Sequence, residues 1–302
     1  HLSQKLDIFV KPEQLVDVAR GITEIFRDDG YRKSRNHARL KFLVADWGAE
    51  KFKEVLIQHL GWTPDPATDW QEPSSLDYPN YTGIHPQKQA GKFWVCVSVL
   101  TGRVNSAQLL AAAEISEKYC EGSVRTTHNQ NIIFPNVDEA QLPEVKAALK
   151  AAGFEWEVSE FKRGGVSCTG TEFCNLALTE TKGRLKEVVA YLESKLLWDE
   201  PIRIHITGCP NSCGQHYIGD VGLYGCKARL NDGTQVEAYD VCLGGRLGSD
   251  AKFVRPIHKK VPATLVKYAL ENVLRNYKAH KSEGESFGQF VDRHTNDQLA
   301  EY

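Results

Sequence analysis

Four cysteines stand in two tight pairs in the second half of the chain. Five residues separate Cys168 from Cys174, and three residues separate Cys209 from Cys213 within Thr207-Gly-Cys-Pro-Asn-Ser-Cys-Gly-Gln215. Because Pro210 fixes its backbone φ and Gly208 has no side chain, the second pair is predicted to lie on a sharp turn that exposes backbone and sulfur together. Two such pairs predict two loops that converge on one bound group.

Composition sets the class of protein around these cysteines. The chain has 302 residues, 41% of them hydrophobic, a net charge of −2 and eight cysteines. That length predicts two domains, and the near-neutral charge argues against binding to nucleic acid or to a membrane surface. Residues 1–11 show no basic segment followed by an apolar core, and nowhere do 18 apolar residues run together. We therefore expect a cytoplasmic protein whose cysteines are thiols or metal ligands.

The four paired cysteines could hold a metal group in more than one way. Structural zinc sites have gaps of about two to four residues in both knuckles, so the five-residue gap fits zinc poorly. An iron–sulfur cluster is favoured, while zinc, disulfides and unrelated core cysteines stay open as alternatives. A helix predicted to begin near residue 174 would place its positive end beside Cys168 and Cys174 and favour their thiolates. The remaining cysteines, Cys96, Cys120, Cys226 and Cys242, are interpreted as small buried hydrophobic residues.

The first 90 residues divide into a helical segment and a linker. Apolar residues recur at helical spacing over 12–28, with Pro12 in the first turn, and over 34–60, with a break expected at Gly48. The domain boundaries predicted here are 1–61 for the helices and 62–90 for a linker, because residues 62–91 show no periodicity.

Residues 91–154 alternate in the order β-α-β-β-α. The predicted elements are a strand at 92–100, a helix at 106–120, short strands at 123–127 and 131–134, and a helix at 138–151. This order predicts a ferredoxin-like half-domain.

Residues 155–280 are predicted to form the domain that carries the cysteine pairs. Its elements are a helix at about 174–197, a strand at 202–206 and a last helix from about residue 265. Residues 281–302 are polar and predict a frayed tail. The fold class is therefore α+β: a ferredoxin-like half-domain followed by a mixed α/β domain.

Four motifs together resemble those of the siroheme and 4Fe-4S nitrite and sulfite reductases. They are Cys168-Thr-Gly-Thr-Glu-Phe-Cys174, Thr207-Gly-Cys-Pro-Asn-Ser-Cys-Gly-Gln-His216, Gly83-Ile-His-Pro-Gln-Lys-Gln89 and Arg125-Thr-Thr-His-Asn-Gln-Asn-Ile-Ile-Phe134. The resemblance extends over residues 10–275. It implies that Cys168, Cys174, Cys209 and Cys213 bind a 4Fe-4S cluster, and that the Cys213 sulfur is also the axial ligand of the siroheme iron.

The resemblance also implies a reaction and its partners. The expected reaction is the six-electron reduction of nitrite, a small anion, to ammonium, with electrons from ferredoxin. Ser212 and Gln215 resemble nitrite reductases more than sulfite reductases. Reduction of sulfite to sulfide with the same cofactors is the nearest alternative. Two further alternatives are a non-catalytic iron–sulfur redox module and a structural zinc module.

The chain departs from the family in one respect. Family members contain two pseudo-symmetric repeats, whereas only one half-domain and one cysteine-bearing half are recognised here. Residues 1–61 resemble only the helical end of the first siroheme-binding half. We therefore expect the substrate-side catalytic residues upstream of His1, and expect the full-length protein to be a monomer.

Two further sets of residues are candidate cofactor ligands. Siroheme carries eight carboxylates that need cationic partners, and the resemblance places the basic segment 32–41 near the cofactor. Within it, Arg35, Arg39 and Lys41 are at helical spacing, although a solvated helix face explains them equally well. Gln130 and Asn131, predicted between two short strands, could donate hydrogen bonds to the cofactor region.

Histidines and a second basic segment complete the candidates. His205 and His216 flank the Gly-Cys-Pro turn and are interpreted as structural histidines rather than proton donors. Residues 252–260 hold five basic side chains, which could steer an acidic ferredoxin or simply be solvated.

Overall fold

A computed structural model describes residues 1–68, 71, 73–74 and 81–302. The chain divides into two compact units, His1–Glu72 and Pro73–Tyr302. Each unit is described by itself.

The N-terminal unit is helical, as predicted. Its elements are α1 (Leu15–Asp29), α2 (Leu40–Trp47) and α3 (Ala49–Leu60), with a small sheet of β1 (Ile8–Phe9) and β2 (Asp65–Pro66). Val18, Ile25, Leu43, Phe52 and Leu56 form its core. The predicted break at Gly48 is confirmed, while Pro12 lies in a short 3-10 turn before α1.

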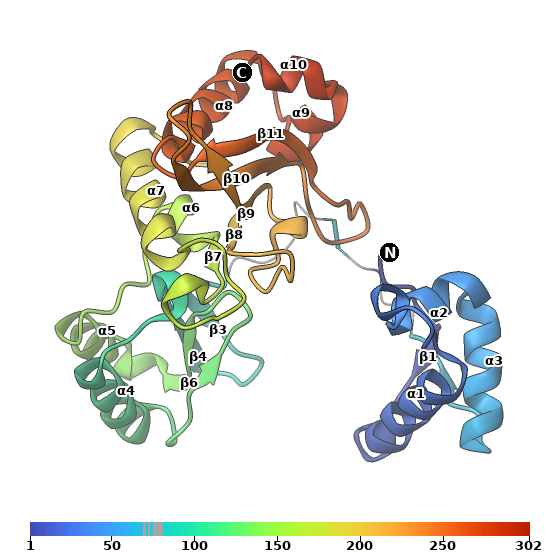
Figure 1. Cartoon of the computed structure of the whole chain (residues 1–302). Helices are drawn as coiled ribbons and strands as arrows, with labels where there is room; N and C mark the ends of the chain where they lie inside the picture. Colours follow the sequence, from blue (N-terminus) through green and yellow to red (C-terminus); the bar gives the residue numbers. More distant parts are fainter. Residues whose placement is uncertain (69–70, 72, 75–80) are drawn as a thin grey trace. The chain divides into compact units, whose positions relative to one another are not determined.

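The second unit begins with the predicted half-domain. Its strands are β3 (Gly83–Pro86), β4 (Lys92–Val97), β5 (Arg125–Thr126) and β6 (Ile132–Asp138), and its helices are α4 (Ser106–Tyr119) and α5 (Leu142–Ala151). The antiparallel strands have the order β3-β4-β6-β5. Both helices pack against this sheet through a shared apolar core (Figure 1).

The predicted linker over 62–90 is too long. Part of it, 69–70, 72 and 75–80, lies outside the described residues, but 83–86 form β3, which pairs with β4 at the edge of the half-domain sheet. The segment Gly-Ile-His-Pro is too short for an alternation of apolar and polar residues to be recognised. β3 is stabilised as a strand by its hydrogen bonds to β4, and its own sequence does not indicate this pairing.

The cysteine-bearing domain is built on a mixed sheet of five strands. The strands are β7 (Gly165–Ser167), β8 (Ile204–Thr207), β9 (Val221–Arg229), β10 (Gln235–Leu243) and β11 (Arg255–Pro262), in the order β11-β10-β9-β8-β7. β8 runs parallel to both β7 and β9, and the other pairs are antiparallel. The helices are α6 (Glu160–Arg163), α7 (Lys182–Lys195) and α8 (Val266–His280). Apolar faces of α7 and α8 join the strands in one core (Figure 1).

Helix α7 begins at Lys182, eight residues later than its predicted start at 174. One side chain, that of Glu180, explains this start. The Glu180 carboxylate accepts hydrogen bonds from the backbone N–H groups of Gly183 and Arg184, both at 2.7 Å, and so caps the helix. The positive end of α7 is therefore matched by Glu180, and the predicted stabilisation of the Cys168 and Cys174 thiolates by this helix end stays a prediction.

The predicted frayed tail at 281–302 is also wrong. Two helices, α9 (Phe287–Arg293) and α10 (Asn296–Ala300), fold back there, with Phe287, Phe290, Val291 and Leu299 buried in the same core as α8. Both helices begin with a capping box, Ser286 with Gln289 and Thr295 with Gln298. Both capping boxes can be read in the sequence and indicate the starts of these two helices.

Candidate metal centre

All four paired cysteines line one cavity of about 390 Å³. β7 ends one residue before Cys168, and the parallel neighbour β8 ends two residues before Cys209. Their register pairs Ser167 with Ile206, so both strands end at the same edge of the sheet. The sheet therefore brings the two loops together, as the sequence predicted.

The second loop is a tight turn stabilised by its own backbone. Ser212 N–H donates to the Cys209 carbonyl at 3.3 Å, and Gln215 N–H donates to the Ser212 carbonyl at 2.8 Å. Ser212 and Gln215 both have positive φ, 54° and 56°, a conformation that residues other than glycine adopt infrequently. A side chain at Gly214 would place its Cβ 2.1 Å from the Ile206 carbonyl oxygen. Only glycine lets this loop pack so closely on β8.

One backbone hydrogen bond stabilises the first loop and another joins it to the second. Cys174 N–H donates to the Gly170 carbonyl at 3.1 Å, and Leu178 N–H donates to the Gly208 carbonyl at 2.7 Å. Gly170 has φ +70°, and a Cβ there would lie 2.6 Å from the Thr181 hydroxyl. That hydroxyl is needed, because it donates to the Cys168 carbonyl at 2.6 Å.

The surroundings of the four sulfur atoms differ. Gly208 N–H donates to Cys168 Sγ at 3.2 Å, the type of hydrogen bond that stabilises a thiolate. Cys209 is buried with 5% exposure, Cys168 and Cys174 are partly buried, and Cys213 is exposed. Cys213 is therefore the most exposed of the four residues.

The donor set fits a 4Fe-4S cluster. Such clusters are held by four cysteine thiolates, and four cysteines line this cavity.

Three of the other four cysteines are buried, as predicted, and Cys226 is only partly buried. Cys96 and Cys120 are fully buried, Cys242 is 5% exposed, and Cys226 is partly buried. Burial raises the pKa of the Cys96 and Cys242 thiols to about 12 and that of the Cys120 and Cys226 thiols to about 11. These thiols are protonated at neutral pH and are poor metal ligands.

His205 and His216 are buried beside the cysteine loop. His205 Nδ1 lies 3.0 Å from the Gln215 carbonyl oxygen, and His216 Nδ1 lies 2.7 Å from the Ser212 hydroxyl. Burial lowers the pKa of each imidazole to about 4. Both are neutral at physiological pH and hold the turn in place, which confirms their interpretation as structural histidines.

The basic residues Arg35, Arg39 and Lys41 do not share one helix. Arg35 lies in the 3-10 turn Arg35–His37, Arg39 has an extended backbone, and Lys41 is in the first turn of α2. The predicted helical spacing is therefore wrong, because α2 starts only at Leu40. All three side chains are exposed in the N-terminal unit, and their contact with a cofactor stays a prediction.

Gln130 and Asn131 are engaged with backbone groups. Asn131 is 6% exposed, and its Oδ1 accepts from Val99 N–H at 2.9 Å. Gln130 Nε2 donates to the Ser167 carbonyl at 2.7 Å, and Gln130 Oε1 accepts from Ser167 N–H at 3.2 Å. Both amides hold the protein chain itself, and Gln130 does so one residue from Cys168.

The basic segment 252–260 is partly used within the fold. Lys252 pairs with Asp292 at 2.7 Å, and Arg255 donates to the carbonyls of Val291 and His294, so both fix the C-terminal helices. Lys259 and Lys260 are exposed on β11.

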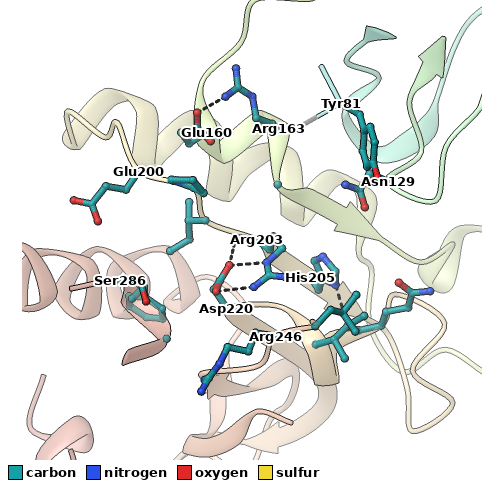
Figure 2. A pocket seen from close by; sticks show the side chains of 18 of the residues that line it. Tyr81, Asn129, Glu160, Arg163, Glu200, Arg203, His205, Asp220, Arg246 and Ser286 are labelled. Atoms are coloured by element: carbon teal, nitrogen blue, oxygen red, sulfur yellow. Dashed lines mark hydrogen bonds and ion pairs between the residues drawn. The ribbon is translucent and has the colours of Figure 1, made fainter. Parts of the chain in front are cut away.

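A second cavity, of about 470 Å³, was not predicted (Figure 2). Its lining comes from segments spread between Tyr81 and Gly288, so no local motif indicates it. Its charged groups are paired: Arg203 with Asp220 through two hydrogen bonds of 2.9 and 3.0 Å, and Arg163 with Glu160. The paired charges favour neither an anionic nor a cationic ligand.

Among the described helices, none has both the length and the apolar character needed to cross a bilayer.

Comparison with protein families gives two matches. The model of the "Nitrite/Sulfite reductase ferredoxin-like half domain" matches residues 85–152. The model of the "Nitrite and sulphite reductase 4Fe-4S domain" matches residues 2–64 and 159–301. The second match covers both the N-terminal helices and the cysteine-bearing domain.

Curated relatives carry names of both activities. The assimilatory ferredoxin-dependent nitrite reductase of Haloferax mediterranei is 35% identical over 315 residues, covering 100% of this chain and 53% of the relative. The ferredoxin–nitrite reductase of Synechococcus elongatus is 41% identical over 78% of this chain and 46% of its own length. A ferredoxin sulfite reductase of Mycobacterium tuberculosis is 36% identical over 99% of this chain and 54% of its own length. The chain thus spans about half the length of the curated relatives it matches.

A solved structure has the same fold. The NirA protein of Mycobacterium tuberculosis superposes with a TM-score of 0.88 and 35% sequence identity, over 98% of this chain and 55% of that one. This agreement confirms the predicted α+β fold class. The chain belongs to the nitrite and sulfite reductase family.

Proposed function

We propose that this chain is the cluster-bearing part of a ferredoxin-dependent nitrite reductase. Cys168, Cys174, Cys209 and Cys213 hold a 4Fe-4S cluster, and the Cys213 sulfur also binds the siroheme iron. The convergence of the four cysteines on one cavity carries this proposal. The family matches support it.

The different exposure of the cysteines suits this division of roles. Cys209, which is buried, would fix the cluster to the end of β8, whereas Cys213 is an exposed residue. A sulfur shared between two metal groups must be open on the side away from the cluster. Siroheme, when bound, would supply the iron at which nitrite is reduced by six electrons that arrive singly.

The protein's own residues position the two cysteine loops before any group binds. The Gly208 N–H aimed at Cys168 Sγ would stabilise the thiolate and influence the reduction potential of a cluster. The close packing of Gly214 against β8 fixes the backbone next to Cys213. Arg35, Arg39 and Lys41 are proposed to meet carboxylates of siroheme, because they are exposed cations in a matched segment of the family.

Ferredoxin is the proposed electron donor. Several relatives are named for it, including both nitrite and sulfite reductases. The exposed cations Lys259 and Lys260 on β11 are compatible with an acidic partner.

Sulfite is the alternative substrate, because relatives of similar identity carry both names. Ser212 and Gln215 favour nitrite. Steady-state turnover of each anion by the purified protein with reduced ferredoxin or a chemical reductant would decide between them. Faster turnover of sulfite than of nitrite would overturn the assignment of nitrite.

Absorption spectroscopy of the anaerobically purified protein tests the cofactors. The proposal predicts the visible bands of siroheme together with a broad iron–sulfur shoulder. The shoulder alone would indicate a redox module, and a colourless protein that contains zinc would refute both readings.

The variant Cys213→Ser tests the shared sulfur. We expect it to alter the siroheme spectrum and the cluster together, because one atom serves both groups. Cys242→Ser is the matched control, since Cys242 is buried in the core and outside the cavity. An unaltered siroheme spectrum in Cys213→Ser would contradict the shared ligand.

A further inference from the structure

The side chain of Gln130 completes the open edge of β7. β7 is the last strand of its sheet, so one side of its backbone has no neighbouring strand. Cys168 N–H donates towards β8, to the Ile206 carbonyl at 3.1 Å. Backbone groups of successive residues in a strand point to opposite sides, so Ser167 presents its N–H and C=O to the open side. The Gln130 amide meets both of them, at 3.2 and 2.7 Å.

This pair of hydrogen bonds has a specific chemical requirement. Ser167 is fully buried, so its backbone N–H and C=O need partners within the protein. A primary amide offers one acceptor and a donor in the same plane, as a peptide group does, whereas a carboxylate offers only acceptors.

The turn that carries Gln130 is built to deliver this amide. Gln130 lies between β5 and β6 with a positive φ of 65°, and its N–H donates to the Thr127 carbonyl at 3.0 Å. A side chain at Gly102 would place its Cβ 3.0 Å from the Gln130 Cβ, so a glycine leaves the space that Gln130 needs. The half-domain therefore reaches the strand that ends at Cys168.

A further hydrogen bond joins the same two domains close to Cys168. The Lys182 ammonium donates to the carbonyl of Thr101, which belongs to the half-domain. Lys182 directly follows Thr181, whose hydroxyl donates to the Cys168 carbonyl. Burial lowers the pKa of Lys182, in agreement with an ammonium enclosed between the two domains. Ser167 and Cys168 are thus fixed from both sides.

We propose that Gln130 is a positioning residue for the cluster, acting through Ser167 on the Cys168 ligand. This inference rests on the proposed function, because it requires that Cys168 binds iron. Residues that orient a metal ligand typically change metal affinity or activity about 10- to 100-fold when they are replaced. The ferredoxin-like half-domain then contributes to how firmly the cluster is held.

The variant Gln130→Met tests the proposal, because methionine has a similar length and can make neither hydrogen bond. The protein, purified with its cluster, is mixed with an iron chelator, and the rate of iron release is measured. We expect release from Gln130→Met to be about tenfold faster than from the wild type, together with a changed EPR spectrum of the reduced cluster. Gln89→Met is the control: Gln89 is exposed in the same half-domain and its side chain contacts Gln87. We expect wild-type release and spectrum from it.

A purely structural role of Gln130 would lower the melting temperature but leave the EPR spectrum and iron release unchanged, and that result would overturn the proposal. If Gln130→Met does not fold, Gln130→Glu decides, because it keeps the acceptor for Ser167 N–H but turns a second acceptor towards the Ser167 carbonyl. An increase in iron release is expected for it, and wild-type release would overturn the proposal. A wild-type protein without iron and sulfide would instead refute the proposed function.

Discussion

The cysteine site depends on residues that bind no metal. Gly214 allows the second loop to lie against β8, Gly170 leaves space for Thr181, and Thr181 holds the Cys168 carbonyl. None of these residues would be chosen as a ligand from its chemistry. Their contribution is to fix the positions of the four sulfurs before a cluster binds, which lowers the entropic cost of assembling the site.

Gly214→Ala should disrupt this arrangement. The added Cβ would lie 2.1 Å from the Ile206 carbonyl oxygen, a backbone atom that cannot move without distorting β8. We expect a loss of about 1–3 kcal/mol in the free energy of unfolding and a reduced cluster content, measured by urea denaturation and by iron analysis. Gly183→Ala is the control, because its Cβ would meet only the flexible Glu180 carboxylate. Equal stability and iron content in both variants would contradict the role of Gly214.

The buried histidines predict a pH-dependent stability. In the folded protein the pKa of His205 and of His216 is lowered to about 4, against about 6.5 in the unfolded chain. Below pH 6.5 the unfolded chain therefore binds protons that the folded protein does not. The free energy of unfolding decreases as the pH is lowered from about 6.5 to about 4. Each histidine should remove about 2 kcal/mol between pH 7 and pH 5.

Denaturation of the wild type and of His205→Gln at pH 7 and pH 5 measures this effect. The variant should be less stable than the wild type at pH 7 but lose about 2 kcal/mol less on going to pH 5. Equal pH dependence of the two proteins would mean that His205 is not held neutral.

At the scale of elements, the sequence predicted regular segments better than their ends. The helices at 106–120 and 138–151 and the strand near 202–206 were recovered because their apolar residues follow a clear period. The start of α7 was missed because the Glu180 side chain, rather than an apolar pattern, determines it. β3 was missed because its structure depends on pairing with β4.

The candidate site shows the same division. The four cysteines were identified correctly as one group because their spacing and the flanking glycine and proline are local features. The contact of Gln130 with Ser167 and the second cavity could not be predicted, because both depend on residues far apart in the chain.

The C-terminal helices provide a test at the scale of an element. Phe290 in α9 is completely buried and packs against Tyr277 of α8 with a ring-centroid distance of 5.3 Å. We expect Phe290→Ala to cost about 3–5 kcal/mol in the free energy of unfolding, measured by chemical denaturation. Leu197→Ala, at a fully exposed position, should cost almost nothing. A wild-type stability of Phe290→Ala would restore the prediction of a frayed tail.

At the scale of the whole molecule, the chain combines the half-domain with the cysteine-bearing domain, and the two meet beside Cys168. Gln130 and Lys182 join the two across it. The same family model matches the cluster domain and the N-terminal helices, and the chain spans about half of the relatives' length.

The most direct test of the central claim is the content of iron, acid-labile sulfide and zinc in the anaerobically purified protein, combined with EPR of the reduced state. The account predicts about four iron and four sulfide per chain and the signal of a reduced 4Fe-4S cluster, all lost in Cys209→Ser, which removes the buried ligand. One zinc per chain without labile sulfide would contradict it.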